Sequence, residues 1–398
     1  ICDDFKMGPL HRELRRVRPL AWRAWPPRGP HRSAAALPSG GRELSSQAGP
    51  GSRFRVVTYN VLNPSLCTSH SYPHCDPAQI DERLRLTRIL ERLDRAIAAS
   101  PYATVLCLQE VNEAWACRLH AHFQPRGYHL IYAPTPWYAY DPMGVCLVWS
   151  NSAFDLQDAE VRRVVEPGQS TAPAPPPSWW SWLKGRAAAV LGGTAPEVDP
   201  WTIARRRPNR YAAARLRFRC SGQQVCVATY HMPALFGSAL LEQVMAVHAA
   251  AVAGLARRFA GEQPLVLAGD FNVQPGAPAH SLLEGSVALG QIVPEPLPAG
   301  GSTPSAEEGA SPRQRLRSAY QEGHGAEPAF TIRSWRADAE SPFVGTLDYI
   351  FVGDDIRVMG AVDLPCAAQF ADSDAFPSAE EPSDHLLLAA DLAVGCAE

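Results

Sequence analysis

The sequence contains no apolar stretch long enough to span a membrane. Its richest hydrophobic runs are interrupted by Arg, Lys, Asp or Gly at short intervals, whereas a spanning helix needs roughly 18 to 20 consecutive, mainly apolar residues. We therefore expect no transmembrane segment. With 398 residues and 46% hydrophobic content, the chain can bury a large core, and we expect a soluble α/β protein that is a monomer.

The cysteines do not point to a metal site or to an oxidising compartment. There are ten, and Cys107, Cys146 and Cys226 fall inside expected core strands, where a reduced thiol behaves as a small hydrophobic side chain. One segment gathers four zinc-type side chains: Cys67, His70, His74 and Cys75. Their spacing matches no familiar zinc finger. A proline-rich loop is therefore the simpler interpretation.

The formal charge of −3 hides an uneven distribution. Residues 1–53 are basic and rich in Arg, Ala, Pro, Gly and Ser, whereas residues 54–398 carry an excess of acid. The leader is typical of a disordered tail or of a transit peptide for a mitochondrion or plastid, so we expect an intracellular protein of the cytoplasm or of an organelle. The acidic body would bind nucleic acid through a local patch and through metal ions rather than through bulk charge.

Apolar runs and helical periods alternate through residues 54–398, which we treat as one catalytic domain. Strands are expected at residues 54–60, 104–108, 128–132, 145–149, 211–218, 225–230, 264–270, 347–352, 356–362 and 386–392, and helices at 79–99 and 239–259. Two similar β/α halves predict two sheets packed face to face with helices outside.

Two low-complexity insertions, at about residues 167–200 and 290–312, interrupt the domain. The first contains Trp179, Trp180 and Trp182 beside a proline-rich linker. This segment could contact a membrane surface or a partner protein, or it could fold back onto its own domain. The second insertion is typical of a surface loop.

Polar side chains follow the apolar runs at several predicted strand ends. Residues 264–268 lead directly into Asp270 and Asn272, and strand ends are where α/β enzymes place their chemistry. The same pattern occurs at Asn60, Glu110, His231, Asp348, Asp384 and His385. Each residue alone could be a cap or a surface group, but together they predict a hydrolase of phosphate esters. Hard oxygen ligands favour Mg²⁺ or Mn²⁺ as its cofactor.

These strand-end motifs, taken in order, resemble the endonuclease/exonuclease/phosphatase superfamily, which implies a four-layer α/β/β/α sandwich. The stretch Gly345-Thr346-Leu347-Asp348-Tyr349-Ile350-Phe351 is similar to the deadenylase branch, which includes the carbon catabolite repression deadenylases, nocturnin, the Angel proteins and the 2′-phosphodiesterase. Tyr59-Asn60-Val61-Leu62 departs from the opening motif of abasic-site DNA repair endonucleases.

The resemblance also implies a role for each residue. Glu110 would be the principal metal ligand, assisted by Asn60 and Asp384. Asp270 would orient or deprotonate the attacking water, and Asn272 would hydrogen-bond the phosphoryl oxygens. His231 and His385 would contact the scissile phosphate, with Asp348 orienting His385.

Four further residues are candidates for substrate binding. Arg210 follows an arginine run and is suited to a phosphate, whereas Trp137, Tyr140 and Phe330 could stack on an unpaired base. The chemistry and the resemblance together favour a Mg²⁺-dependent 3′-end RNA exonuclease that acts on single-stranded RNA. Two alternatives remain open: an enzyme acting on a small phosphorylated nucleotide or phosphoinositide, and a silent binding module.

Overall fold

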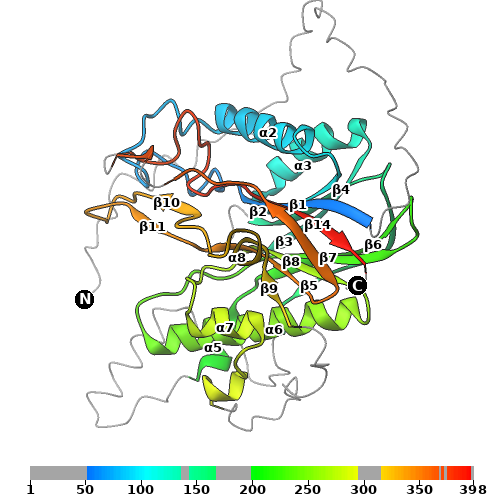
Figure 1. The fold of residues 1–398 in the computed structure, drawn as a ribbon. Helices are drawn as coiled ribbons and strands as arrows, with labels where there is room; N and C mark the ends of the chain where they lie inside the picture. The colour runs from blue at the N-terminus through cyan, green and yellow to red at the C-terminus, as the bar shows by residue number, and fades with distance from the viewer. Residues whose placement is uncertain are drawn as a thin grey trace, which may run out of the picture. The chain divides into compact units, whose positions relative to one another are not determined.

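Two six-stranded β-sheets lie at the centre of the protein, with helices outside them (Figure 1). The computed structural model describes residues 52–135, 143–166, 199–294, 315–366, 369–371 and 374–395. The strand order is β13-β14-β1-β2-β4-β3 in the first sheet and β5-β6-β7-β8-β12-β9 in the second, and β10 pairs with β11 separately. The predicted α/β/β/α sandwich is therefore confirmed.

The elements have the following bounds. The strands of the first sheet are β1 (Ser52–Asn60), β2 (Ala103–Asn112), β3 (Tyr128–Thr135), β4 (Met143–Ser150), β13 (Ile356–Ala361) and β14 (Leu388–Val394). Those of the second are β5 (Phe154–Arg163), β6 (Arg210–Phe218), β7 (Gln224–His231), β8 (Leu265–Asp270), β9 (Arg317–Ser318) and β12 (Asp348–Val352), and the small pair is β10 (Ile332–Ser334) with β11 (Phe343–Gly345). The helices are α2 (Glu82–Ala98), α3 (Glu113–Phe123), η1 (Gln124–Arg126), α5 (Pro200–Arg206), α6 (Ala239–Ala260), α7 (Pro278–Glu284), η2 (Leu289–Gln291) and α8 (Ala319–His324).

Alternating side chains of the strands build three hydrophobic layers. One face of each sheet contributes to a shared core between the sheets, with residues such as Val56, Val227 and Ile350. The opposite face of the first sheet packs against α2 and α3, and that of the second packs against α5, α6 and α7. Because successive strand residues point to opposite faces, strands buried on both sides are largely apolar.

The long helices follow their sequence signals. Asp81 caps α2 by accepting a hydrogen bond from the amide of Leu84 at 2.9 Å, and the helix buries Arg85, Ile89 and Leu93 at four-residue spacing. By length and composition α6 could cross a membrane, but 56% of its apolar window is buried inside the protein. This burial is typical of a core helix.

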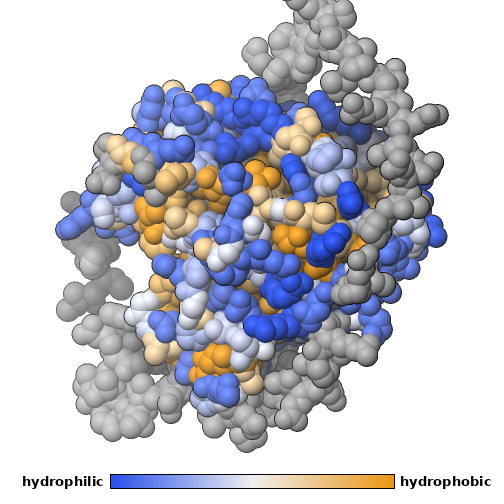
Figure 2. Space-filling model, in the orientation of Figure 1, coloured by the Kyte–Doolittle hydropathy of each residue, from blue (hydrophilic) through white to orange (hydrophobic). Residues whose placement is uncertain are grey.

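The predicted strands and long helices all occur, with ends that differ by a few residues. The sequence did not predict β5, an edge strand whose side chains are mostly polar and exposed. Most of the two insertions, including Trp179, Trp180 and Trp182, lies outside the described residues. On the face shown in Figure 2, hydrophilic residues cover much of the surface, with hydrophobic patches between them.

Candidate active site

The strand directions bring the predicted polar residues to one edge of the sandwich. Strands β1 and β2 are parallel, so Asn60 and Glu110 emerge together. Strands β7 and β8 are also parallel, so His231 lies beside Asp270. Strand β12 runs antiparallel to β8 and begins with Asp348 opposite Asp270. Five strands from two sheets therefore contribute to one site.

Asn60 connects the two sheets at this edge. It is fully buried, and its Nδ2 donates to Glu110 Oε1 at 3.0 Å and to Asp270 Oδ2 at 2.9 Å. Its Oδ1 accepts from the amide of Leu62 at 3.0 Å, which fixes the orientation of the carboxamide. In this orientation Asn60 presents a nitrogen, not an oxygen, to the carboxylates. It positions Glu110 and Asp270 rather than offering a ligand atom beside them.

A β-bulge directs Glu110 into the site. The pairing of β2 with β4 shifts between Leu108 and Val111, and Glu110 has a positive φ of 59°. Gln109 bonds across the sheets to Thr229 Oγ1 at 3.1 Å, so a regular strand would turn Glu110 away from that side. Because of the extra residue in the bulge, the side chains of Gln109 and Glu110 both point to the same side of the sheet. Glu110 is held there by the amide of Asn63, at 2.9 Å from Oε2.

His385 and Asp348 form a buried hydrogen-bonded pair. His385 Nδ1 lies 2.8 Å from Asp348 Oδ2, which also accepts from the Thr331 hydroxyl at 2.7 Å. His385 Nε2 then faces Asp270 Oδ2 at 3.7 Å. Burial disfavours the charged imidazole, but Asp348 and Asp270 outweigh it and raise the pKa of His385 well above its ordinary value. The two carboxylates therefore favour the protonated form of this ring, whose Nε2 is directed at the site.

Asp270 lies among these charged groups. Burial raises its pKa, as does the neighbouring Asp348, while His385, His231 and the Asn60 hydrogen bond act in the opposite direction. His231 Nε2 is 3.5 Å from Asp270 Oδ2 and 3.9 Å from Glu110 Oε1. Asp270 is thus a buried carboxylate between two imidazoles, a suitable place for a proton acceptor.

Asn272 follows Asp270 in a left-handed conformation, with φ of 51°. Its backbone amide donates to Asp270 Oδ1 at 3.0 Å. Its side-chain Nδ2 donates to the carbonyl of Met232 at 2.8 Å, so the amide nitrogen predicted to contact substrate holds the backbone beyond β7 in this structure.

Asp384 approaches from the segment before β14. Ser383 Oγ ties this segment to β1 by donating to the Asn60 carbonyl at 2.7 Å. Asp384 Oδ2 accepts from the Tyr72 hydroxyl at 2.6 Å, whereas Oδ1 has no hydrogen-bond partner within the part of the chain that the structure describes. This oxygen lies 4.0 Å from His385 Nε2.

The donor set fits a divalent cation. Four largely buried carboxylates, those of Glu110, Asp270, Asp348 and Asp384, share the site with two histidines. Asp348 Oδ1 and Asp384 Oδ1 both lack hydrogen-bond partners among the described residues. Buried carboxylates need compensation by charge or hydrogen bonds, and oxygen ligands suit Mg²⁺ or Mn²⁺.

Two ligand sets are conceivable from these atoms. Ligand atoms of Asp270, Asp348 and His385 lie within 4.8 Å of one another, but the hydrogen bond between His385 and Asp348 already explains that proximity. Imidazole is also less suited to Mg²⁺ than oxygen is. Glu110 and Asp384, the ligands that the family resemblance implies, form the second set.

The structure describes two of the four predicted substrate-binding residues, Phe330 and Arg210. Phe330 is only 2% exposed and packs edge-on against Phe370 between the sheets, so its predicted role in base stacking is wrong for this conformation: a ring that completes the core has no free face. Arg210 begins β6 beside the end of β7. Trp137 and Tyr140 lie outside the described residues.

Within the described residues, the segment from Cys67 to Cys75 contains no cluster of three or more metal-ligating side chains. Cys67 and Cys75 pack in a small apolar cluster with Tyr72, and His74 stacks on Trp335 with ring centroids 3.9 Å apart. Burial raises the pKa of Cys67 to about 11 and that of Cys75 to about 12, so both thiols stay protonated.

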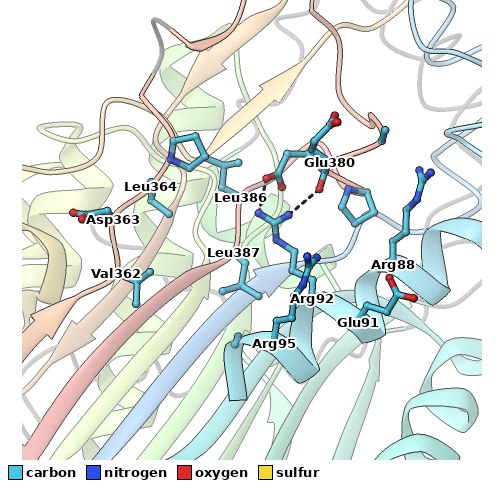
Figure 3. Close-up of a pocket in the computed structure, with 15 residues that line it drawn as sticks. Arg88, Glu91, Arg92, Arg95, Val362, Asp363, Leu364, Glu380, Leu386 and Leu387 are labelled. Carbon is cyan, nitrogen blue, oxygen red and sulfur yellow. Dashed lines mark hydrogen bonds and ion pairs between the residues drawn. The ribbon is translucent and has the colours of Figure 1, made fainter. Parts of the chain in front are cut away.

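A cleft of about 650 Å³ lies apart from these polar residues, between α2 and the segments before β14 (Figure 3). Arg92 of α2 spans part of it, donating to the Glu380 carbonyl at 2.9 Å and pairing with Glu381. None of the polar residues of the candidate active site lines this cleft. This cleft is therefore not the candidate active site. The bonds that Arg92 makes across it hold the chain just before Asp384 in place.

Several residues that complete the site carry no signal in the sequence. Tyr72 and Thr331 support the two aspartates described above, and their only signal would have been their position near other motifs. Phe236, in the loop after β7, is 58% exposed, and Phe343 of β11 is 42% exposed. Each lies five residues in sequence from a residue of the site, His231 or Asp348, and large exposed aromatics so placed are candidates for ligand contact.

Comparisons with known proteins agree with this arrangement. Residues 57–385 match the model of a family described as the endonuclease/exonuclease/phosphatase family. Nocturnin of Drosophila melanogaster is 31% identical over 199 residues, covering 49% of this chain and 29% of that protein. Protein angel homolog 2 of Homo sapiens is 27% identical over 273 residues, covering 67% and 42%. The chain thus spans less than half the length of these curated relatives.

Solved structures show the same fold. ANGEL2, described as a 2′,3′-cyclic phosphatase and solved with adenosine-2′,3′-vanadate, aligns with a TM-score of 0.62 at 20% identity, covering 87% of this chain and 97% of that one. The catalytic domain of human nocturnin with bound sulfate aligns with a TM-score of 0.54 at 20% identity, covering 87% and 94%. At such identity the likeness concerns the fold alone.

Proposed function

The chain belongs to the endonuclease/exonuclease/phosphatase family, and we propose that it is a divalent-metal-dependent hydrolase that acts on the 3′ end of RNA. The observation that carries this proposal is the convergence of buried carboxylates with two histidines at one edge of the sandwich. Such an edge suits in-line attack of water on a phosphate ester, because it offers a proton acceptor, donors for the phosphoryl oxygens and oxygen ligands for a cation.

Glu110 and Asp384 would hold the cation, Mg²⁺ or Mn²⁺. When bound, the cation would supply positive charge that neutralises the phosphoryl oxygens. Asn60 would keep Glu110 in position through its amide nitrogen. Glu110 is also fixed by a backbone amide, so the carboxylate would lose little freedom on binding.

Asp270 would orient and deprotonate the attacking water. Its two oxygens already accept hydrogen bonds from the Asn272 amide and from Asn60 Nδ2, which fixes the plane of the carboxylate. Burial and Asp348 raise its pKa, which brings the carboxylate closer to the value that suits a general base at neutral pH.

The two histidines would bind the phosphoryl group from either side of this base. His385 Nε2 and His231 Nε2 lie 3.7 and 3.5 Å from Asp270 Oδ2, and both can donate to phosphoryl oxygens. Asp348 holds the other nitrogen of His385 and so keeps Nε2 directed at the substrate. Asn272 would exchange its bond to the Met232 carbonyl for one to the phosphoryl group.

Two further features favour a nucleotide substrate. The side chains of Phe236 and Phe343 are exposed and lie on segments that adjoin His231 and Asp348 in sequence, so they could stack on an unpaired base. Arg210 would lie opposite His231, since the next pair along the ladder is Tyr211 with Tyr230, and it suits a neighbouring phosphate. A mononucleotide, a nucleotide cofactor or a phosphoinositide is the alternative substrate.

The experiment compares hydrolysis rates on five substrates in Mg²⁺: oligoadenylate RNA, 2′–5′ oligoadenylate, RNA ending in a 2′,3′-cyclic phosphate, a phosphorylated dinucleotide and abasic DNA. We expect turnover of one or more RNA substrates from the 3′ end. EDTA and Glu110→Gln should both abolish this turnover, because each removes the cation. Glu113→Gln, an exposed acid three residues away, is the matched control and should keep full activity.

Activity that survives both EDTA and Glu110→Gln would refute the metal-dependent mechanism. Turnover of the phosphorylated dinucleotide alone would keep the mechanism and replace RNA by a small nucleotide. Cation binding without hydrolysis of any of the five substrates would favour a binding module.

A further inference from the structure

The two carboxylate oxygens of Asp384 differ in their hydrogen bonding: one accepts a hydrogen bond, and the other has no partner among the described residues. The Tyr72 hydroxyl donates to Oδ2 at 2.6 Å, a distance expected for a hydrogen bond to a carboxylate. Oδ1 has no such partner in the described residues and lies near His385 Nε2. The side chain of Asp384 is therefore oriented by a residue 312 positions away in sequence.

Tyr72 is itself held rigidly. It is fully buried, and Ser334 Oγ approaches its hydroxyl at 3.5 Å. The guanidinium of Arg336 lies over its ring, 4.7 Å from the centroid. Its loop is also pinned from outside, because the amide of Ala337 donates to the Ser71 carbonyl at 3.2 Å. The hydroxyl thus has a fixed place from which to orient a carboxylate.

Tyr72 is the donor in its bond to Asp384, because a carboxylate oxygen only accepts hydrogen bonds. A permanent donor on Oδ2 prevents rotation that would exchange the two oxygens. Oδ1 is then the oxygen available to a ligand in the site.

We propose that Tyr72 is a positioning residue for the cation site, which holds Asp384 through Oδ2 so that Oδ1 faces the cation. The inference rests on the proposed metal-dependent function. It adds a residue from the loop after β1 to the residues that determine cation affinity. Groups that hydrogen-bond a metal-ligating carboxylate typically contribute 10- to 100-fold in metal affinity.

The test is Tyr72→Phe, which keeps the ring, its packing and its contact with Arg336 and removes only the hydroxyl. Mn²⁺ binding to the full chain is measured by isothermal titration calorimetry, so that the readout does not depend on any substrate. We expect affinity for Mn²⁺ to fall about 10-fold or more. In hydrolysis assays the Mg²⁺ concentration for half-maximal rate should rise by a similar factor, and the rate at saturating Mg²⁺ should recover.

Two controls separate positioning from packing. Tyr211→Phe removes a hydroxyl that is equally buried and has no partner among the described residues, and it should leave Mn²⁺ affinity unchanged. In an Asp384→Asn background, Tyr72→Phe should cause little further loss, because the residue acts through Asp384.

Unchanged Mn²⁺ affinity in Tyr72→Phe would overturn the proposal, as would a lower rate at saturating Mg²⁺ with normal affinity. An additive loss in the Asp384→Asn background would also overturn it. Wild-type protein that binds Mn²⁺ but hydrolyses nothing would contradict the proposed function while leaving the role of Tyr72 testable by the titration.

Discussion

Replacing Arg85 by Met should destabilise the protein strongly. Arg85 is fully buried in α2. Its Nε donates to the Pro382 carbonyl at 2.7 Å, and its Nη2 donates to the carbonyls of Val61 and Leu62 at 2.7 and 2.6 Å. One side chain therefore joins the turn after Asn60 to the segment before Asp384. Methionine fills a similar volume but satisfies none of these carbonyls.

The cost follows from the hydrogen bonds that are lost. A bond from a charged donor contributes about 1.5–3 kcal/mol, and a buried group left unpaired costs a similar amount. Three carbonyls accept hydrogen bonds from this one guanidinium. We therefore expect Arg85→Met to lower the free energy of unfolding by about 3–5 kcal/mol. With an unfolding entropy of about 2.1 cal/mol/K per residue and the 281 residues that the structure describes, this loss corresponds to a Tm decrease of about 5–8 °C.

The assay is thermal unfolding monitored by circular dichroism, with urea unfolding as a second measure of the free energy. Arg83→Met, at an exposed position two residues earlier in the same helix, is the control and should change stability by less than about 0.5 kcal/mol. A Tm for Arg85→Met within about 1 °C of the wild-type value would refute this reasoning. It would show that the buried guanidinium does not stabilise the fold.

Three further outcomes are expected. Asp348→Asn should lower kcat by about 10²–10⁴, because His385 loses its charged partner; a decrease of less than about 10-fold would contradict this role. Burial lowers the pKa of His248 to about 3, so below about pH 6.5 only the unfolded chain takes up this proton and stability falls toward pH 3. At pH 5 the free energy of unfolding should be about 2 kcal/mol lower than at pH 7. Urea unfolding at pH 5 and 7 should show this difference in the wild type and not in His248→Gln. Arg210→Gln should raise KM for an oligonucleotide and reduce the salt dependence of binding by about one unit of slope, whereas Arg217→Gln, on an exposed ion pair with Asp155 at the other end of β6, should not.

The strand-end residues could be predicted because each follows an apolar run, and parallel strands bring their ends together. Asn60, His231 and Asp270 were located in this way, and the structure brings them within hydrogen-bonding or ion-pair distance of one another or of Glu110. The periodic helices were also predictable. Edge strand β5 was not predictable, because a bulge between Leu156 and Asp158 interrupts its alternation of apolar and polar residues.

Contacts between distant segments were beyond what sequence spacing can show. Phe330 has the same apolar character whether it stacks on a base or completes a core, and only its 2% exposure separates the two roles. The bond from Tyr72 to Asp384 depends on the tertiary fold rather than on any local pattern. The direction of the Asn60 amide depends on which of its neighbours are donors, and residue type alone does not specify this.

Backbone strain in the described residues gathers at the candidate site. The non-glycine residues with positive φ there are Leu62, Glu110 and Asn272, and such conformations cost on the order of 1–3 kcal/mol each. Hydrogen bonds offset the strain: Asn60 accepts from Leu62, and Asp270 accepts from Asn272. The Leu62 carbonyl is in turn held by Arg85. Removing that guanidinium therefore releases a strained turn beside Asn60, and Arg85→Met should reduce activity even below its melting temperature.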